Sequence, residues 1–376
     1  MEHVAFADPD DLGARIAEAR GRASLTQAQL ADAVELDRST IAKLERGLRR
    51  VSALELARIA DALGERIEWF VTEPPPSIVA HRNLQEAGAV SPRIDRDVER
   101  VARTVEFVAR HDDRLVLASP SPLRRPETIA DVESAAVSAR GLLHLDDAEP
   151  FRDASARAAD LGLLVFSFDL GPDGADAASI LLEQGGVAVV NGTLRVGRRR
   201  LAVVHELGHH LFADEYAVDW RIAEQDDDGA WEARLDRFAR AVLLPPAGLR
   251  RRWSELRQHG DDLRTAAVRI GSGYRVDMST LARRLAELAL VDPEDARQIR
   301  SVRTTRADIV EFNLLVHDEL AAPSLPRRYE ESVLRLYRSE SVSAARAIDL
   351  LFDAWDEDDL PSPPMLPEGA IWEFVS

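Results

Sequence analysis

The chain contains no cysteine and only one lysine among its 376 residues. Without thiols, disulfide bonds and thiolate metal sites are excluded, so any metal ion must be held by histidine and carboxylate side chains. The sequence has no apolar run near the roughly 18 residues that a membrane-spanning helix needs, and its acidic start lacks the pattern of a secretory leader. We therefore expect a cytoplasmic protein with no membrane partner. The lone lysine, Lys43, we attribute to genomic composition bias.

The overall charge also excludes one class of function. A net charge of −18 argues against a protein that coats nucleic acid nonspecifically, so contact with DNA would need a local basic patch. A length of 376 residues, with 45% hydrophobic and 30% charged residues, predicts two or three globular domains with ample material for a core.

Residues 12–64 show the pattern of short helices joined by tight turns. Thr26 is placed to cap the start of a helix, with Gln29 at the capping-box position. Asp37 and Ser52 precede two further helices, which Gly47 and Gly64 end. Helices of this length joined in this way are what a helix-turn-helix requires.

This stretch resembles the Xre/Cro/cI repressor family. Thr26-Gln27 matches the start of the family's second helix, and the runs Asp37-Arg38-Ser39-Thr40-Ile41 and Glu45-Arg46-Gly47 match its recognition helix. The resemblance implies a five-helix, commonly dimeric DNA-binding domain, which we expect over residues 1–73. The expected DNA contacts are Gln27, Arg38, Ser39, Thr40, Lys43, Arg46 and Arg49.

Glu35 departs from this family, which usually has glycine in the turn before the recognition helix. A left-handed turn costs more without glycine, and a carboxylate near DNA repels it. Weakened or altered DNA binding, and a first domain that only dimerises or binds protein, are therefore alternatives. After it, prolines at 74–76 and a helical apolar spacing over 95–110 predict a linker and connector helix, residues 74–125.

Residues 201–212 carry the motif His-Glu-x-x-His, formed by His205, Glu206 and His209. Positions i and i+4 lie on one face of a helix, so both imidazoles can bind one metal ion, and Glu206 can take a proton from the attacking water. Gly208 is a poor helix former and is expected to let another backbone or a substrate approach closely. Three strands, at 163–168, 179–183 and 187–190, are predicted before this helix.

A third metal ligand is expected from Glu232, with Asp236 four residues later on the same helix face. Glu232 would bind the ion, and Asp236 would accept the free ring N–H of a ligating histidine. A solvated pair on an amphipathic helix is the alternative. Two histidines and one carboxylate suit Zn²⁺ best, with Mn²⁺ as the second choice.

These motifs together resemble the ImmA/IrrE family of metallo-endopeptidases. The resemblance covers the run Arg200-Leu201-Ala202-Val203-Val204-His205-Glu206-Leu207-Gly208-His209 and the later pattern Glu232-x-x-x-Asp236-x-Phe238-Ala239 followed by Leu243-Leu244-Pro245. It implies an α+β, mostly helical chain with a zincin-like domain built on a small three-stranded sheet. We expect that domain over residues 126–292 and a helical C-terminal region over 293–376, whose tail is acidic, proline-rich and finally aromatic. The last stretch, residues 369–376, is expected to dock on the body as a strand, and a partner-binding tail is the alternative.

The leading functional hypothesis is a DNA-binding regulator that hydrolyses a protein. The resemblance implies a repressor-like substrate, and the chain itself, cut near residues 74–76, is a further candidate. Tyr216, His210 and Arg221 are all candidates for stabilising the oxyanion. The alternative is a non-proteolytic antitoxin or transcription factor whose peptidase-like domain binds a partner such as a toxin.

Overall fold

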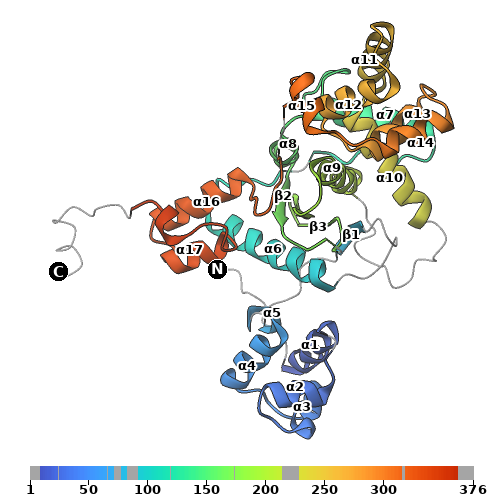
Figure 1. Ribbon diagram of the computed structural model, residues 1–376. Coiled ribbons are helices and arrows are strands. Elements are labelled where there is room, and N and C mark those ends of the chain that lie inside the picture. The colour runs from blue at the N-terminus through green and yellow to red at the C-terminus, as the bar shows by residue number, and fades with distance from the viewer. Residues whose placement is uncertain are drawn as a thin grey trace, which may run out of the picture. The chain divides into compact units, whose positions relative to one another are not determined.

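The computed structural model describes nine segments of the chain, and these form two compact units, Met1–Pro75 and Pro76–Ser376. The predicted α+β, mostly helical class is confirmed (Figure 1). No helix in the described segments is long and apolar enough to cross a membrane. The aromatic stretch 369–376 lies outside the described segments. These segments are residues 9–23, 25–65, 67–71, 78–82, 92–118, 120–172, 174–213, 228–315 and 318–362.

The first unit is an all-helical bundle in its described part. Thr26 and Gln29 form the predicted capping box, and Ser52 and Glu55 form a second one. Gly64 ends the fourth helix in the left-handed conformation. Ile16, Leu30, Ile41, Ile59 and Phe70 are fully buried and hold the bundle together. Its helices are α1 (Pro9–Arg22), α2 (Gln27–Ala33), α3 (Arg38–Glu45), α4 (Ala53–Leu63) and α5 (Ile67–Val71).

The second unit is organised on a mixed sheet. The three predicted strands form as β2 (Leu163–Phe168), β3 (Ala177–Leu181) and β4 (Gly186–Asn191). A fourth strand, β1 (Ile78–Arg82), was not predicted, because so short an apolar run after prolines carries no strand signal of its own. The order is β1-β3-β4-β2, with β2 parallel to β4 and the other two pairs antiparallel.

Side chains alternate between the two faces of the sheet, as the two-residue period of a strand dictates. Leu164 and Val187 point to the face covered by α6 (Pro92–His111), whose Val98 and Val101 are completely buried there. Val165 and Ala188 point to the opposite face. The segment expected to be a linker and connector thus supplies both β1 and a core helix. On the α6 side, α16 (Arg327–Arg338) and α17 (Ala344–Leu350) complete the same apolar cluster.

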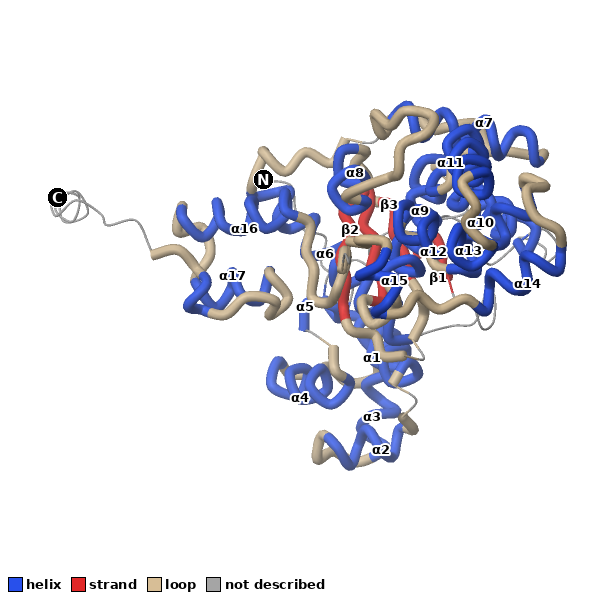
Figure 2. Tube along the Cα trace, turned by 45° about the horizontal axis from the view of Figure 1, so that its top comes forward, coloured by secondary structure: helices blue, strands red, loops and turns tan. Residues whose placement is uncertain are grey.

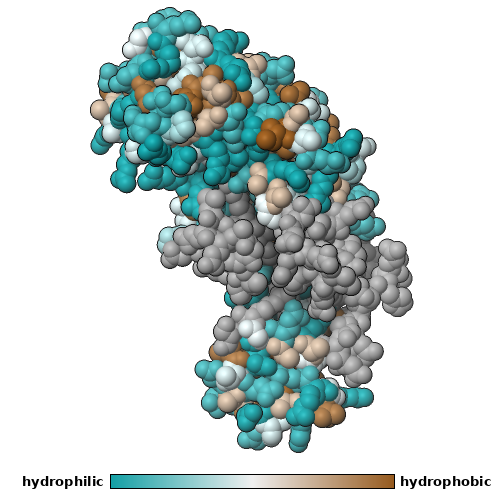
Figure 3. Space-filling model, turned by 90° about the vertical axis from the view of Figure 1, so that its right-hand side faces the viewer, coloured by the Kyte–Doolittle hydropathy of each residue, from teal (hydrophilic) through white to brown (hydrophobic). Residues whose placement is uncertain are grey.

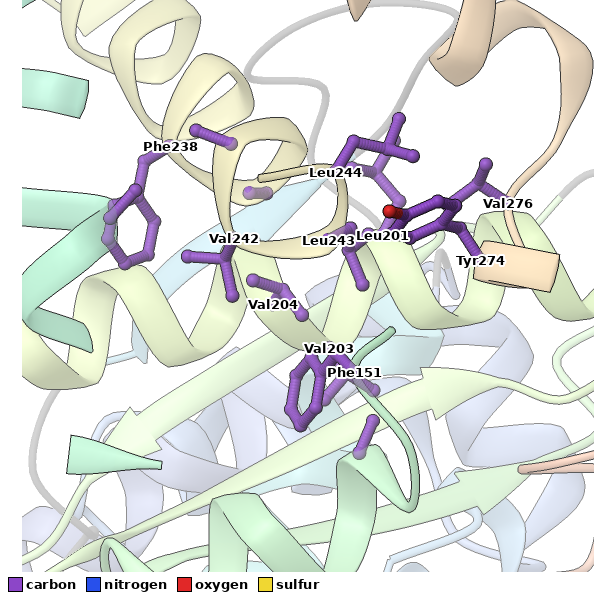
Figure 4. Packing of buried hydrophobic residues seen from close by; sticks show 14 of the residues in the cluster. Phe151, Leu201, Val203, Val204, Phe238, Val242, Leu243, Leu244, Tyr274 and Val276 are labelled. Atoms are coloured by element: carbon purple, nitrogen blue, oxygen red, sulfur yellow. The ribbon is translucent and has the colours of Figure 1, made fainter. Parts of the chain in front are cut away.

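Helix α9 (Val196–Phe212) covers the opposite face of the sheet, and α10 (Asp228–Leu243) packs across it. Figure 4 shows Val203 and Val204 of α9 among Val242, Leu243 and other apolar side chains of this layer. Further helices surround the pair (Figure 2). They are α7 (Ile129–Leu142), α8 (Ala154–Asp160), α11 (Pro246–Gln258), α12 (Leu263–Tyr274), α13 (Met278–Glu287), α14 (Pro293–Ser301) and α15 (Arg306–Glu311). A 3-10 turn, η2 (Glu357–Asp359), contacts α17.

Two buried arginines near the start of α9 bind residues far along the chain. Arg199 pairs with Asp318, and Arg200 pairs with Glu319 and donates to the carbonyl of Phe151. Burial lowers the pKa of Arg200, and the negative charge of Glu319 opposes that effect. On the face shown in Figure 3, the surface of the described residues is largely hydrophilic.

Candidate metal centre

The motif lies in the most buried helix of the site, so its polar side chains are held away from water. His205, Glu206 and His209 expose 1%, 0% and 2% of their surface. Charged groups this deeply buried need partners or a metal ion. Burial is the first evidence that the motif is more than an accident of sequence.

Gly208 explains how α10 comes close enough to contribute. A Cβ atom at this position would lie 2.9 Å from Leu235 Cδ2 and 3.1 Å from Phe238 Cδ1. Gly208 was expected to admit another backbone or a substrate, and the groups that lie nearest to it are side chains of α10. The same helix carries Glu232 and Asp236.

The structure brings together His205, His209 and Glu232, the three predicted ligands. Glu232 Oε2 lies 3.0 Å from His205 Nε2, and Glu232 Oε1 lies 3.6 Å from His209 Nε2. One ligand atom from each residue falls within 4.8 Å of the other two. Bonds of about 2.0–2.2 Å at tetrahedral angles separate ligand atoms by about 3.4 Å, so these residues fit an ion such as Zn²⁺.

Asp236 lies where it can orient His205. Its Oδ1 is 3.1 Å from His205 Nδ1. A carboxylate at neutral pH only accepts, so binding of a metal ion at Nε2 would leave the ring proton on Nδ1, which would donate it to Asp236. Arg240 lies 3.9 Å from Asp236 Oδ2 and pairs with Glu287 at 2.7 Å, which supports the carboxylate from behind.

The electrostatics of Glu232 favour the ionised form that a metal ion requires. Burial raises the pKa of this carboxyl group, but the hydrogen bond to His205 and the charges of His205 and His209 outweigh that effect. The net pKa of Glu232 is therefore below its ordinary value.

Glu206 has a partner that sequence reasoning missed. Ser179 Oγ, on β3, donates a hydrogen bond of 2.6 Å to Glu206 Oε2. The other oxygen, Oε1, is buried and has no hydrogen-bond partner among the described residues. The available signal was a lone polar residue inside an apolar strand, since Ser179 is 4% exposed between the buried Ala178 and Ile180.

Of the three candidate oxyanion donors, only His210 lies in the described part of the chain. Its Nε2 is 2.8 Å from the carbonyl oxygen of Leu161, so this ring nitrogen is already engaged within the fold. Burial lowers the pKa of His210. Tyr216 and Arg221 lie outside the described residues.

In the first unit, α3 presents a polar face opposite the buried Ile41 and Leu44. Of the six predicted contacts on and after α3, Thr40 is half-buried and five are exposed: Arg38, Ser39, Lys43, Arg46 and Arg49. Arg49 pairs with Glu55 at 2.7 Å.

Two features of this unit bear on DNA binding. Gln27 Nε2 donates to Glu45 Oε2 at 2.7 Å, and Arg20 pairs with the same carboxylate at 2.6 Å. The side chain of Gln27 is thus held within the unit, at the start of α2. Glu35, in the turn before α3, has a φ of 56°. It therefore adopts the left-handed conformation expected at a position where the Xre/Cro/cI family usually has glycine.

Comparisons with known proteins match both halves of this description. Residues 16–70 match the helix-turn-helix family model, and residues 158–286 match the model of the IrrE N-terminal-like domain. A search of curated proteins found no match.

Similar solved structures include regulators from several bacteria. The restriction-modification controller protein C.AhdI from Aeromonas hydrophila is 35% identical over 17% of this chain and 98% of its own, with a TM-score of 0.17. ComR from Streptococcus suis is 12% identical over 94% of this chain and 97% of its own, with a TM-score of 0.17. The competence regulator ComR from Streptococcus vestibularis is 14% identical over 87% and 97%, with a TM-score of 0.16.

Proposed function

Since the chain joins a helix-turn-helix domain to an IrrE N-terminal-like domain, we propose that it is a DNA-binding regulator with a metal-dependent endopeptidase. The observation that carries the proposal is the convergence of His205, His209 and Glu232, with ligand atoms within 4.8 Å of one another. Asp236 behind His205 and the buried Glu206 beside it are what such an enzyme needs. Zn²⁺ is the proposed ion, with Mn²⁺ as the alternative.

The chemistry divides between the ion and the protein. A bound ion would supply the positive charge that acidifies water and polarises the scissile carbonyl group. Glu206 takes the proton through Oε1, because Oε2 is held by Ser179. The same carboxyl group then gives the proton to the leaving amine. Asp236 keeps the ring of His205 in one tautomer and orientation throughout.

Glu206→Gln tests the peptidase proposal. The amide keeps the size of the side chain but cannot accept the proton, so we expect cleavage to fall by at least about 100-fold, the range for loss of a general base. Metal content, measured by mass spectrometry of the eluted ion, should stay at the wild-type level. A variant that cleaves as fast as the wild type would refute the mechanism. Wild-type chain that holds metal without cleaving any protein would favour the alternative, a partner-binding domain such as that of an antitoxin.

The substrate we propose is a regulatory protein, either a repressor or this chain itself. Self-cleavage near residues 74–76 would separate the DNA-binding unit from the peptidase unit. Intact-mass measurement after metal addition distinguishes the two, because only self-cleavage yields two fragments of this chain. An unchanged mass together with cleavage of a separate repressor would exclude self-cleavage.

For the first unit we propose DNA binding through the exposed face of α3, as a homodimer. Lys43 and Arg38 are both exposed on that face. Lys43→Ala should weaken binding about tenfold if it makes a base contact worth 1–3 kcal/mol. Fluorescence anisotropy with promoter DNA at fixed salt measures this. Equal affinity of the two proteins would exclude a base contact by Lys43, and no binding at low salt would favour a unit that only dimerises.

A further inference from the structure

β1 lies at the edge of the catalytic sheet but comes from the chain segment that directly follows the first unit. It pairs antiparallel with β3, with Ala80 opposite Ser179 and His81 opposite Ala178. Without β1, β3 would be the edge strand, with its outer N–H and C=O groups unpaired. Such an edge is a ready template for any extended peptide.

The edge that β1 covers belongs to the strand that hydrogen-bonds the reacting carboxylate. Ser179, in the middle of β3, donates its hydroxyl to Glu206. Helix α9, which carries Glu206 and two of the three metal-binding side chains, lies against both β3 and β1. A peptide paired with β3 would therefore run beside the groups proposed to cleave it.

The pairing of β1 is less regular than that of the other strands. β3 and β4 pair continuously over five residues, from Ala177↔Val190 to Leu181↔Gly186. Between β1 and β3 the register shifts between Ile78 and Ala80, which leaves one residue of β1 out of the ladder. A bulge interrupts the hydrogen-bond ladder locally, so β1 is the strand held by the fewest regular backbone contacts.

We propose that β1 occupies, within the same chain, the edge of β3 at which an extended peptide substrate binds. The expected effect on cleavage rests on the peptidase proposal. The pairing of β1 with β3 rests on the sheet alone. Substrate must displace β1 to pair with β3, so the segment joining the two units restrains the peptidase.

Competition from a tethered strand is large enough to measure. Strands joined by short linkers act at an effective concentration on the order of 1 mM. A strand that binds its edge with a dissociation constant of about 0.1 mM would then weaken binding of an added peptide about tenfold. Removing the competitor should restore that factor.

The test replaces both Ala80 and His81 with proline in the full chain. Adjacent amides of a strand point in opposite directions, so one of the two prolines removes an N–H that faces β3. Ala80→Val is the control, because valine keeps the N–H and favours strands. All three proteins carry Glu206→Gln so that the probe is not cut, and bound metal and thermal unfolding are measured for each.

The probe is a fluorescent peptide with the sequence of residues 76–84, and its anisotropy reports binding. We expect the double-proline chain to bind it at least tenfold tighter than the Glu206→Gln chain, and Ala80→Val to leave binding unchanged. With Glu206 restored, the double-proline chain should also cleave substrate faster. Equal peptide binding by all three folded, metal-loaded chains would overturn the inference and leave the peptidase proposal intact. Tighter binding without any cleavage would support the inference and count against the peptidase proposal.

Discussion

Gly208→Ala tests whether the packing of α9 on α10 sets the geometry of the metal centre. The added methyl group would lie 2.9 Å from Leu235 Cδ2 and 3.1 Å from Phe238 Cδ1. Ordinary contacts between carbon atoms are about 3.5–4.0 Å. Leu235 and Phe238 are both completely buried, so neither can swing into solvent to make room.

Two opposing effects determine the stability of the variant. Alanine is favoured over glycine within a helix by about 1 kcal/mol. Adding a methyl group to a well-packed core costs about 1–3 kcal/mol. The two together predict a loss of about 0–2 kcal/mol in the free energy of unfolding, so the helical gain is at best cancelled.

The effect on metal binding should be clearer than the effect on stability. Relief of the clash requires α10 to move away from α9 by several tenths of an ångström, and α10 carries Glu232 and Asp236. The 3.0 Å separation of Glu232 Oε2 from His205 Nε2 would then lengthen. We expect the metal dissociation constant to rise about tenfold, which corresponds to about 1.4 kcal/mol.

Competition with a chromophoric chelator measures the metal affinity, and chemical denaturation of the metal-free chain measures stability. Gly141→Ala is the matched control, because Gly141 also lies in a helix, α7, but has no atom within 4 Å of its added Cβ. That control should be neutral or stabilised, with unchanged metal affinity. Similar gains in stability and unchanged affinity in both variants would refute the argument that this contact positions the ligands.

Three further changes probe the contact of Asp236 with His205, the buried ion pair of Arg284 and the turn before α3. Asp236→Ala should weaken metal binding about 10–100-fold, since His205 loses the group that orients it; unchanged affinity in the same chelator assay would exclude that role. Glu133→Gln removes the bidentate partner of the completely buried Arg284 and should lower the free energy of unfolding by about 2 kcal/mol. The cost stays below that of losing every partner, because Glu287 also contacts Arg284. Burial raises the pKa of Glu133, but Arg284 and Arg237 bring it below its ordinary value, so this stabilisation is complete above about pH 4.3 and is lost as pH falls through the folded-state pKa. Denaturation series across pH should show the wild type and variant converging in acid, and a constant difference would contradict the assignment. Glu35→Gly should raise stability by up to about 1 kcal/mol, because its φ of 56° strains a side chain, and should tighten DNA binding by removing a carboxylate; lower stability would show that the turn tolerates Glu35.

Local signals in the sequence were enough to predict the first four helices of the first unit and three strands of the second. Capping residues such as Thr26 and Ser52 act within three residues, so the sequence carries them directly. The strands β2 and β4 are continuous apolar runs between glycines. The proposed metal-binding set could also be predicted, because the spacing of His205 and His209 places both on one helix face and Glu232 and Asp236 share a face of another helix.

The features that were missed all depend on contacts between distant residues. β1 is a strand only because β3 offers it an edge, and nothing in residues 78–82 announces that partner. Helix α6 was recognised by its apolar spacing, but the same spacing suits a connector or a core element. The hydrogen bond from Ser179 to Glu206 joins two elements whose relation follows from the packing of α9 on the sheet.

The arginines at the start of α9 have a consequence for how this protein can be shortened. Arg199 and Arg200 are 3% and 0% exposed, and their carboxylate partners are Asp318 and Glu319. A chain that ended after residue 292 would leave both guanidinium groups buried without those partners, at a cost of several kcal/mol. The cost would fall on the helix that carries His205, Glu206 and His209. We therefore expect that a chain can be divided at the proline-rich junction and the first unit replaced by another. The C-terminal helices, in contrast, must be kept in any chain that contains the proposed metal centre.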